Sequence, residues 1–232
     1  MSLKLEMVNF IHHYEKIRQS GCVVDCAILI AYGVNTEGKR EILGLSVSLS
    51  EGEMHWRSFL ESLVSRGLNG IKLIISDAHS GLKAALRAVF PSVPWQRCQF
   101  HLQQNAQAYV TKRDRKSEVA GSIRAIFDAE NMAEAERILK LAVAKYEKEM
   151  PQLALWMQEN ISEGLTIFNF PSSHRRRIRT SNIAERVNQE IRRRSRVARI
   201  LPNTASCERL AGALVMEISE QWLIGTIYLN VE

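Results

Sequence analysis

The stretch Cys22–Ser50, CVVDCAILIAYGVNTEGKREILGLSVSLS, decides the fold class. Residues 22–33 form a strongly apolar run rich in β-branched side chains, and residues 40–50 alternate partly between apolar and polar side chains. The Asn and Gly residues between the two runs supply turn chemistry. Two such runs joined by a turn predict an antiparallel hairpin with a somewhat long loop.

Strands and helices alternate through the rest of the first hundred residues. Residues 53–66 carry apolar side chains at helical spacing and end at Gly67, while residues 82–90 form a second amphipathic pattern before a proline. Short apolar runs at residues 71–75 and 93–98 predict two further strands. This alternation indicates a layered α/β fold.

The character of the sequence changes after that. Residues 101–157 are almost wholly helix-like, with Pro151 separating two helices; residues 164–173 resemble a loop, and further helices are expected from Ser181 and over residues 208–228. We therefore expect an α/β core whose first part is residues 1–98, an all-helical insertion at residues 99–172, and a returning helix with C-terminal helices of the core at residues 173–232.

Composition excludes several classes of protein. Hydrophobic residues make up 46% of the chain, which is too many for a disordered segment. No run reaches the ~18 apolar residues of a membrane span, and the first residues lack a signal-peptide pattern. The four cysteines are scattered and form no disulfide framework, so we expect a reducing, cytoplasmic setting.

Positive charge is concentrated in one segment. Ten arginines lie between Arg175 and Arg199, opposed only by Glu185 and Glu190, which gives 10 − 2 = +8. The whole chain is +6, so the remainder sums to 6 − 8 = −2. Planar guanidinium groups suit phosphate oxygens, so nucleic acid is the first candidate partner. A solvated helix face is the alternative, although such faces usually mix charges of both signs.

Two carboxylates are candidate metal ligands, and each has a structural alternative. Asp77 follows an apolar strand, where α/β folds place reactive groups, but it could instead cap the next helix. Glu185 shares a predicted helix face with Arg192 and Arg196, opposite an apolar stripe of Ile183, Val187 and Ile191. It could instead complete a capping box with Asn182. Magnesium prefers one or two carboxylates together with substrate phosphates.

Cys98 and His101 have the spacing of metal ligands. A zinc site needs about four ligands, however, and no second Cys/His pair lies at a usual spacing. A zinc-dependent binding module is therefore an alternative that depends on these two residues alone.

Taken together, four stretches resemble the Mutator-type transposases of bacterial insertion sequences. The likeness runs from about Tyr14 to the C-terminus. The matching stretches are GVNTEGKREILGLSVSLSEGE (33–53), IISDAHSGLKAALRAVFP (74–91), WQRCQFHLQQN (95–105) and RTSNIAERVNQEIRRRSRV (179–197).

The resemblance implies a ribonuclease-H-like fold: a mixed sheet flanked by helices, with an all-helical insertion before the last catalytic helix. It also implies a DDE site, in which two aspartates and one glutamate hold two Mg²⁺ or Mn²⁺ ions. The second aspartate falls on Asp77 and the glutamate on Glu185, both as catalytic metal ligands. Four further residues match motif positions and are expected to support the structure or the site: Cys98, His101, Asn182 and Asn188.

The function implied is cleavage and transfer of DNA strands during transposition. The expected partners are insertion-sequence ends, target DNA and further copies of the chain, near the bacterial nucleoid, with no membrane. The arginines expected to contact DNA are Arg175, Arg176, Arg177, Arg192, Arg193 and Arg196.

One departure from the family pattern matters. The first aspartate of the family falls on Ile11, three residues before Tyr14, and an aliphatic side chain cannot ligate a hard cation. Asp25 lies on the next strand, where the family needs no acid. We therefore expect a truncated and impaired transposase, because the chain starts almost at the catalytic domain and lacks one bridging ligand. The alternative is a catalytically dead remnant that still binds DNA or oligomerises.

Overall fold

The computed structural model describes the backbone of residues 3–50 and 52–230, and the side chains of residues 5–50, 52–181 and 185–230. The chain forms two compact units, Met1–Pro94 with Asn182–Glu232, and Trp95–Ser181. The division into 1–98, 99–172 and 173–232 stays a prediction. Across the described residues, no helix combines the length and the apolar character needed to cross a membrane.

The first unit is built on a mixed sheet. Strands β1 (Leu3–Gln19), β2 (Cys22–Asn35) and β3 (Arg40–Ser48) pair antiparallel in sequence order. Strand β5 (Leu73–Ser76) and the short β4 (Leu68–Asn69) pair parallel to β1. The predicted hairpin and the α/β class with a mixed sheet flanked by helices are confirmed.

Strand β1 is the member of this sheet that contacts the most others, because it pairs with β2, β4 and β5. It joins β2 through Ser20 and Gly21, which have φ angles of 49° and 83°. Two central residues with positive φ are the geometry of a type I′ hairpin turn, whose twist matches that of the strands. The turn thereby fixes the pairing of β1 with β2.

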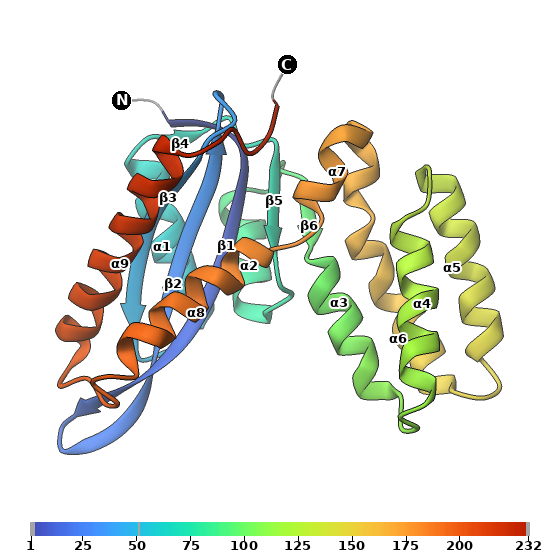
Figure 1. The fold of residues 1–232 in the computed structure, drawn as a ribbon, viewed down its shortest axis with the longest axis horizontal. Helices are drawn as coiled ribbons and strands as arrows, with labels where there is room; N and C mark the ends of the chain where they lie inside the picture. The colour runs from blue at the N-terminus through green and yellow to red at the C-terminus, as the bar shows by residue number, and fades with distance from the viewer. Residues whose placement is uncertain (1–2, 51, 231–232) are drawn as a thin grey trace. The chain divides into compact units, whose positions relative to one another are not determined.

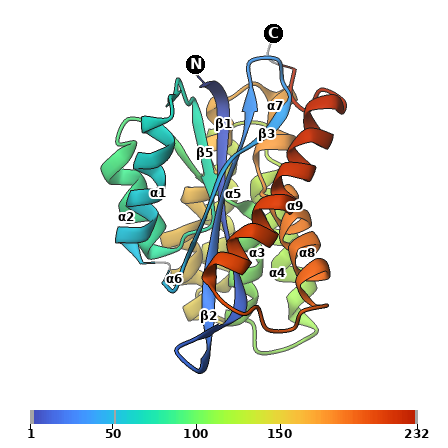
Figure 2. The same cartoon turned by 90° about the vertical axis from the view of Figure 1, so that its left-hand side faces the viewer.

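Helices cover both faces of the sheet. On one face, Trp56 of α1 (Glu53–Ser65) meets Phe10 of β1 edge to face, with ring centroids 6.3 Å apart, and α2 (Ser80–Val89) packs on α1. On the other face lie α8 (Asn182–Ser195) and α9 (Thr204–Ile224). Figures 1 and 2 show these two pairs of helices on opposite sides of β1, β2 and β3.

An apolar core joins α8 and α9 to the sheet. It is made of side chains from the alternate positions of β1 and β2 that face these helices, as expected for the two-residue period of a strand. Its buried members are Ile11, Ile17, Cys26, Ile28, Ile30, Tyr32, Val187, Ile191, Leu201, Cys207, Ala211, Leu214 and Val215.

The second unit is mostly helical. It contains the short strand β6 (Trp95–Arg97) and the helices α3 (Gln99–Ala106), α4 (Arg115–Phe127), α5 (Met132–Tyr146), α6 (Pro151–Asn160) and α7 (Ser172–Ile178). The predicted break between two helices at Pro151 is confirmed, because α5 ends at Tyr146 and α6 begins at Pro151. The expected loop at residues 164–173 instead includes the 3₁₀ turn Thr166–Asn169 and the start of α7.

Two glycines should respond in opposite ways to alanine. Gly38 has φ +74°, its carbonyl accepts the N–H groups of Tyr228 and Leu229, and a Cβ there would clash with the Leu229 carbonyl. Gly212 lies in α9, and a Cβ there would have no neighbour within 4 Å among the described residues. Gly38→Ala should lower the free energy of unfolding by about 1–3 kcal/mol, whereas Gly212→Ala should raise it by up to about 1 kcal/mol. Thermal unfolding of both variants checks this, and a stabilised Gly38→Ala would contradict the tight contact.

Candidate functional site

Asp77 stands where β5 ends, next to residue 11 of β1. The parallel register pairs Phe10 with Ser76, so Ile11 is level with Asp77. Asp77 is half-buried, and its carboxylate accepts the Ala78 N–H at 2.8 Å. The alternative of Asp77 as a helix cap is wrong, because the N-cap of α2 is His79.

Ile11 is part of the apolar core beneath α8. Its side chain is 8% exposed and belongs to the same cluster as Val187 and Ile191 of that helix. The burial of Val187 and Ile191 agrees with the predicted apolar stripe; the side chains of Ile183 and of Asn182 lie outside the described residues. Position 11 therefore faces α8 with an aliphatic group, at the position where the resemblance implies a carboxylate.

Polar contacts also attach α8 to β1. The Asn188 side-chain amide donates to the His12 carbonyl at 3.2 Å, and the Ser195 hydroxyl donates to Glu15 at 2.7 Å. The same Glu15 oxygen lies 2.7 Å from the His13 ring. Our sequence reasoning missed His13, Glu15 and Ser195. The sequence feature that could have indicated His13 and Glu15 is that they share alternate positions of one strand with Ile11.

The Glu15 carboxylate is stabilised by this setting. Burial raises the pKa of its carboxyl, but the hydrogen bonds from His13 and Ser195 and the charges of His13 and Arg192 outweigh it, so the pKa lies below the ordinary glutamate value. Glu15 is thus an anionic anchor between β1 and α8.

The arginines of α8 are exposed. Arg193 hydrogen-bonds Glu190 at 2.6 Å and, with Arg194, lowers the pKa of Glu190 to about 2. Arg192 and Arg196 are exposed and form no ion pair within the described part of the chain. Arg192 on α8, and Arg196 directly after it, are members of the predicted DNA-binding set that a ligand could contact without breaking an ion pair.

Arg175, Arg176 and Arg177 belong to α7 of the other unit. Arg175 is half-buried, donates to the carbonyls of Glu130 and Phe170 at 2.7 and 3.2 Å, and lies over the Phe168 ring at 5.0 Å. Its guanidinium therefore holds α7 in place, whereas Arg176 and Arg177 are exposed.

Cys98 and His101 lie together at the start of α3. The Cys98 thiol is fully buried and accepts the Ser181 N–H at 3.3 Å and the Ser181 hydroxyl at 3.2 Å. Burial raises its pKa, but the hydrogen bond and charge of His101 and the Ser181 contacts outweigh it, leaving a net lowering. Among the described residues, no three His, Cys, Asp or Glu side chains are grouped to hold a metal, so a zinc site would lack ligands here.

Removing the Ser195 hydroxyl should weaken the attachment of α8. Ser195→Ala should lower the free energy of unfolding by about 1.5 kcal/mol at neutral pH, since the hydroxyl bonds a charged acceptor. The Glu15 pKa is lowered by folding, so the loss should persist above the unfolded glutamate pKa of about 4.3 and shrink as the pH falls through the folded value. Urea unfolding against Ser58→Ala, an exposed serine of α1, checks this; equal losses would contradict it.

Comparison with known proteins adds to this geometry. The model of the family described as Transposase, Mutator family matches residues 3–225. The transposase for insertion sequence element IS406 of Burkholderia multivorans is 56% identical over 217 residues, covering 94% of this chain and 56% of that protein. The transposase for element ISRM5 of Rhizobium meliloti is 38% identical over 219 residues, covering 94% and 55%.

The chain spans about half the length of these curated relatives. Among solved structures, a chain of the simian T-cell lymphotropic virus intasome in complex with PP2A regulatory subunit B56 gamma is 11% identical over 68% of this chain and 48% of that chain. Its TM-score of 0.28 is too low to establish a shared fold. The match to the family model over almost the whole chain is decisive: this chain belongs to the Mutator family of transposases.

Proposed function

We propose that this chain is the catalytic core of an insertion-sequence transposase, built to cut and join DNA strands, and that this copy is impaired by Ile11. Membership of the family implies dependence on a divalent metal in general. The observation that supports the proposal is the register of β1 and β5: Phe10 pairs with Ser76, so Asp77 directly follows the partner of Phe10, and Ile11 belongs to the apolar cluster shared with α8.

The contacts of α8 support a place for Glu185 at the same level. From Ser195 back to Asn188 is seven helical residues, roughly 10.5 Å, and from Glu15 back to His12 is three strand residues, roughly 10 Å. The two contacts are therefore about equally far apart along the helix and along the strand, as expected if α8 lies along β1. Three residues before Asn188, on the same helix face, is Glu185, roughly 4.5 Å further along. That distance corresponds to residue 11.

The carboxylates present suit one hard cation better than two. Asp77 and Glu185 offer the oxygen ligands that Mg²⁺ or Mn²⁺ requires. A two-metal site needs a further carboxylate to bridge the ions, and Ile11 offers none. The chain thus departs from the DDE pattern at one ligand, so we derive no metal-dependent step for it.

The rest of the family pattern extends the proposal. We infer a ribonuclease-H-like core with an all-helical insertion at residues 99–172, DNA held by the arginines predicted within residues 175–196, and assembly of several copies on DNA. A second candidate is a catalytically dead remnant that binds DNA or oligomerises. The packing of Ile11 against Val187 and Ile191 favours it, because the apolar group completes the core at the position of the missing ligand.

Restoring the acid should create metal-dependent stability. In Ile11→Asp, a carboxylate replaces a buried aliphatic side chain near Asp77. In the absence of metal, the variant should therefore be less stable than the parent. Mn²⁺ should raise its melting temperature more than that of the parent. Ile11→Asn, which lacks the charge, should respond no more than the parent, and Asp77→Asn in the Ile11→Asp background should cancel the response. An equal response of parent and Ile11→Asp would contradict the shared site.

The parent chain itself should nick or join DNA carrying insertion-sequence ends poorly in Mg²⁺ or Mn²⁺. Strong activity that Asp77→Ala abolishes would show that another residue replaces the ligand at position 11. Asp25 is poorly placed for this, because it pairs with Lys16 at 2.7 Å, five residues along β1 from Ile11.

DNA binding should depend on Arg192 of α8 and on Arg196 directly after it. Arg192→Glu/Arg196→Glu should weaken binding to duplex DNA and reduce its dependence on salt, because each lost phosphate contact removes about 0.9 from the slope of log K against log salt. Fluorescence anisotropy across a salt series measures both quantities. Arg18→Glu/Lys39→Glu, an equal charge change at the strands, serves as the control. Identical effects in the two variants would exclude a specific role for α8.

A further inference from the structure

We propose that the basic segment Lys112–Lys116 and the pocket beside it bind the phosphate backbone of DNA. This second contact would lie in the helical unit, separate from the arginines of α8. The inference rests on the proposed function in that the ligand is the DNA on which a transposase acts.

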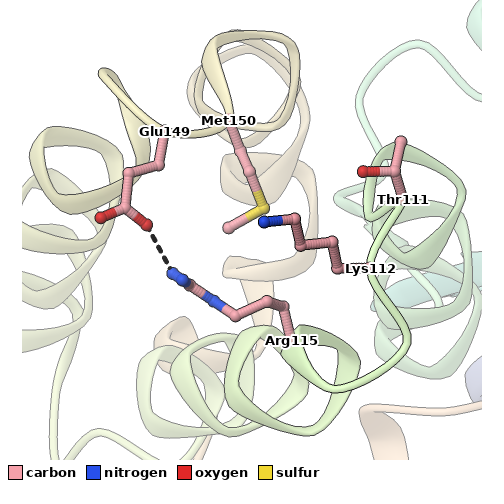
Figure 3. Close-up of a pocket in the computed structure, with 5 residues that line it drawn as sticks. All are labelled: Thr111, Lys112, Arg115, Glu149 and Met150. Atoms are coloured by element: carbon pink, nitrogen blue, oxygen red, sulfur yellow. Dashed lines mark hydrogen bonds and ion pairs between the residues drawn. The ribbon is translucent and has the colours of Figure 1, made fainter.

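The pocket lies where the connection before α4 meets the connection between α5 and α6. It has a volume of about 360 Å³ and is lined by Thr111, Lys112, Arg115, Glu149 and Met150. Figure 3 shows the side chains of Lys112 and Arg115 extending into the same space, with Glu149 and Met150 entering from the other connection.

One of these cations is held in a fixed position. The Arg115 guanidinium lies 2.7 Å from Glu118 and 2.6 Å from Glu149, and both contacts restrict its orientation. A pre-oriented guanidinium loses little side-chain entropy when it binds a phosphate oxygen, but a phosphate would share this guanidinium with Glu149, so most of the added attraction would come from Lys112 and its neighbours. Lys145 also pairs with Glu118, at 2.7 Å, so Arg115 does not neutralise that carboxylate alone.

The other cations are not used by the fold. Residues 112–116 carry four basic side chains and Asp114, which gives 4 − 1 = +3. Lys112, Arg113 and Lys116 are exposed, and within the described part of the chain their side chains have no hydrogen-bond or ion-pair partner. A ligand could therefore bind these side chains without breaking a hydrogen bond or an ion pair within the described part of the chain.

The spread of these charges indicates a polyanion rather than a single small anion. The pocket alone could hold one phosphate group between Lys112 and Arg115. Arg113 and Lys116 lie in the same segment but do not line the pocket, so they would meet neighbouring phosphates of a continuous backbone. Contacts of this kind position a protein on DNA without reading its sequence.

The test compares variants that remove equal charge from the helical unit. Lys112→Gln/Arg113→Gln removes two charges from the segment, and Arg124→Gln/Lys140→Gln removes two from exposed positions on α4 and α5. Arg124 lies nine helical residues from Arg115, roughly 13.5 Å away. Binding of the whole 232-residue chain to a fluorescent DNA duplex is measured across a salt series, with melting temperatures as the check on folding.

The segment variant should bind DNA more weakly, with a salt slope smaller by up to about 2 for two lost phosphate contacts. The Arg124/Lys140 control should stay near the parent, and the charge-conserving Lys112→Arg/Arg113→Lys should keep the parent slope.

Three results would overturn the inference. If the segment variant matches the control while Arg192→Glu/Arg196→Glu still weakens binding, the helical unit has no such contact but the proposed function stands. If inorganic phosphate binds the parent and needs Lys112 while DNA binding does not, the pocket is a small-anion site. If the parent binds no DNA at all, the DNA-binding part of the proposed function fails as well.

Discussion

The attachment of α8 to β1 is the interaction on which the rest of the candidate site depends. Two hydrogen bonds, from Asn188 to the His12 carbonyl and from Ser195 to Glu15, fix the helix along the strand. Val187 and Ile191 of the same helix belong with Ile11 to one buried apolar cluster. Within the described part of the chain, Glu185 makes no hydrogen bond or ion pair to the sheet, so its position follows from how these neighbours hold the helix. A small shift of α8 along β1 would therefore alter the distance between Glu185 and Asp77 while leaving the fold intact.

The same attachment is compatible with the proposal that one substitution impairs chemistry without disrupting the structure. An aspartate at position 11 would stand among two apolar side chains and next to Asp77, an arrangement that costs free energy unless a cation neutralises it. Isoleucine removes that cost and fills the space with an aliphatic group. The apolar core of this unit is then complete without metal. The arginines of α8 stay exposed and charged whichever residue occupies position 11. The proposed loss of a metal ligand at position 11 of β1 is therefore compatible with the proposed contact of the α8 arginines with DNA.

Local patterns predicted much of the fold and less of the site. The β2–β3 hairpin and α1 were predictable because their apolar periodicity is strong and their turns carry glycine. Strand β1 was not predictable from its pattern, because His12, His13, Glu15 and Lys16 interrupt the two-residue alternation of apolar and polar side chains. The dipeptide Ser20-Gly21 was nevertheless a usable signal for the turn that follows it. Asp77 was identified at the end of its strand, but its alternative role as a cap was excluded only by the start of α2 at Ser80. The contact of Ser195 with Glu15 joins residues 180 apart in sequence, and no local pattern contains it. The arginine run reads as one segment, yet its residues belong to two units.

The most direct measurement is the crystal structure of the Ile11→Asp variant grown with Mn²⁺, with the anomalous signal of manganese used to locate the ions. We expect manganese between the carboxylates of residues 11, 77 and 185, with α8 seated on β1 through Asn188 and Ser195 as described. Manganese bound elsewhere, or a Glu185 side chain directed away from Asp77 with α8 in the same position, would contradict a shared metal site at the end of β5.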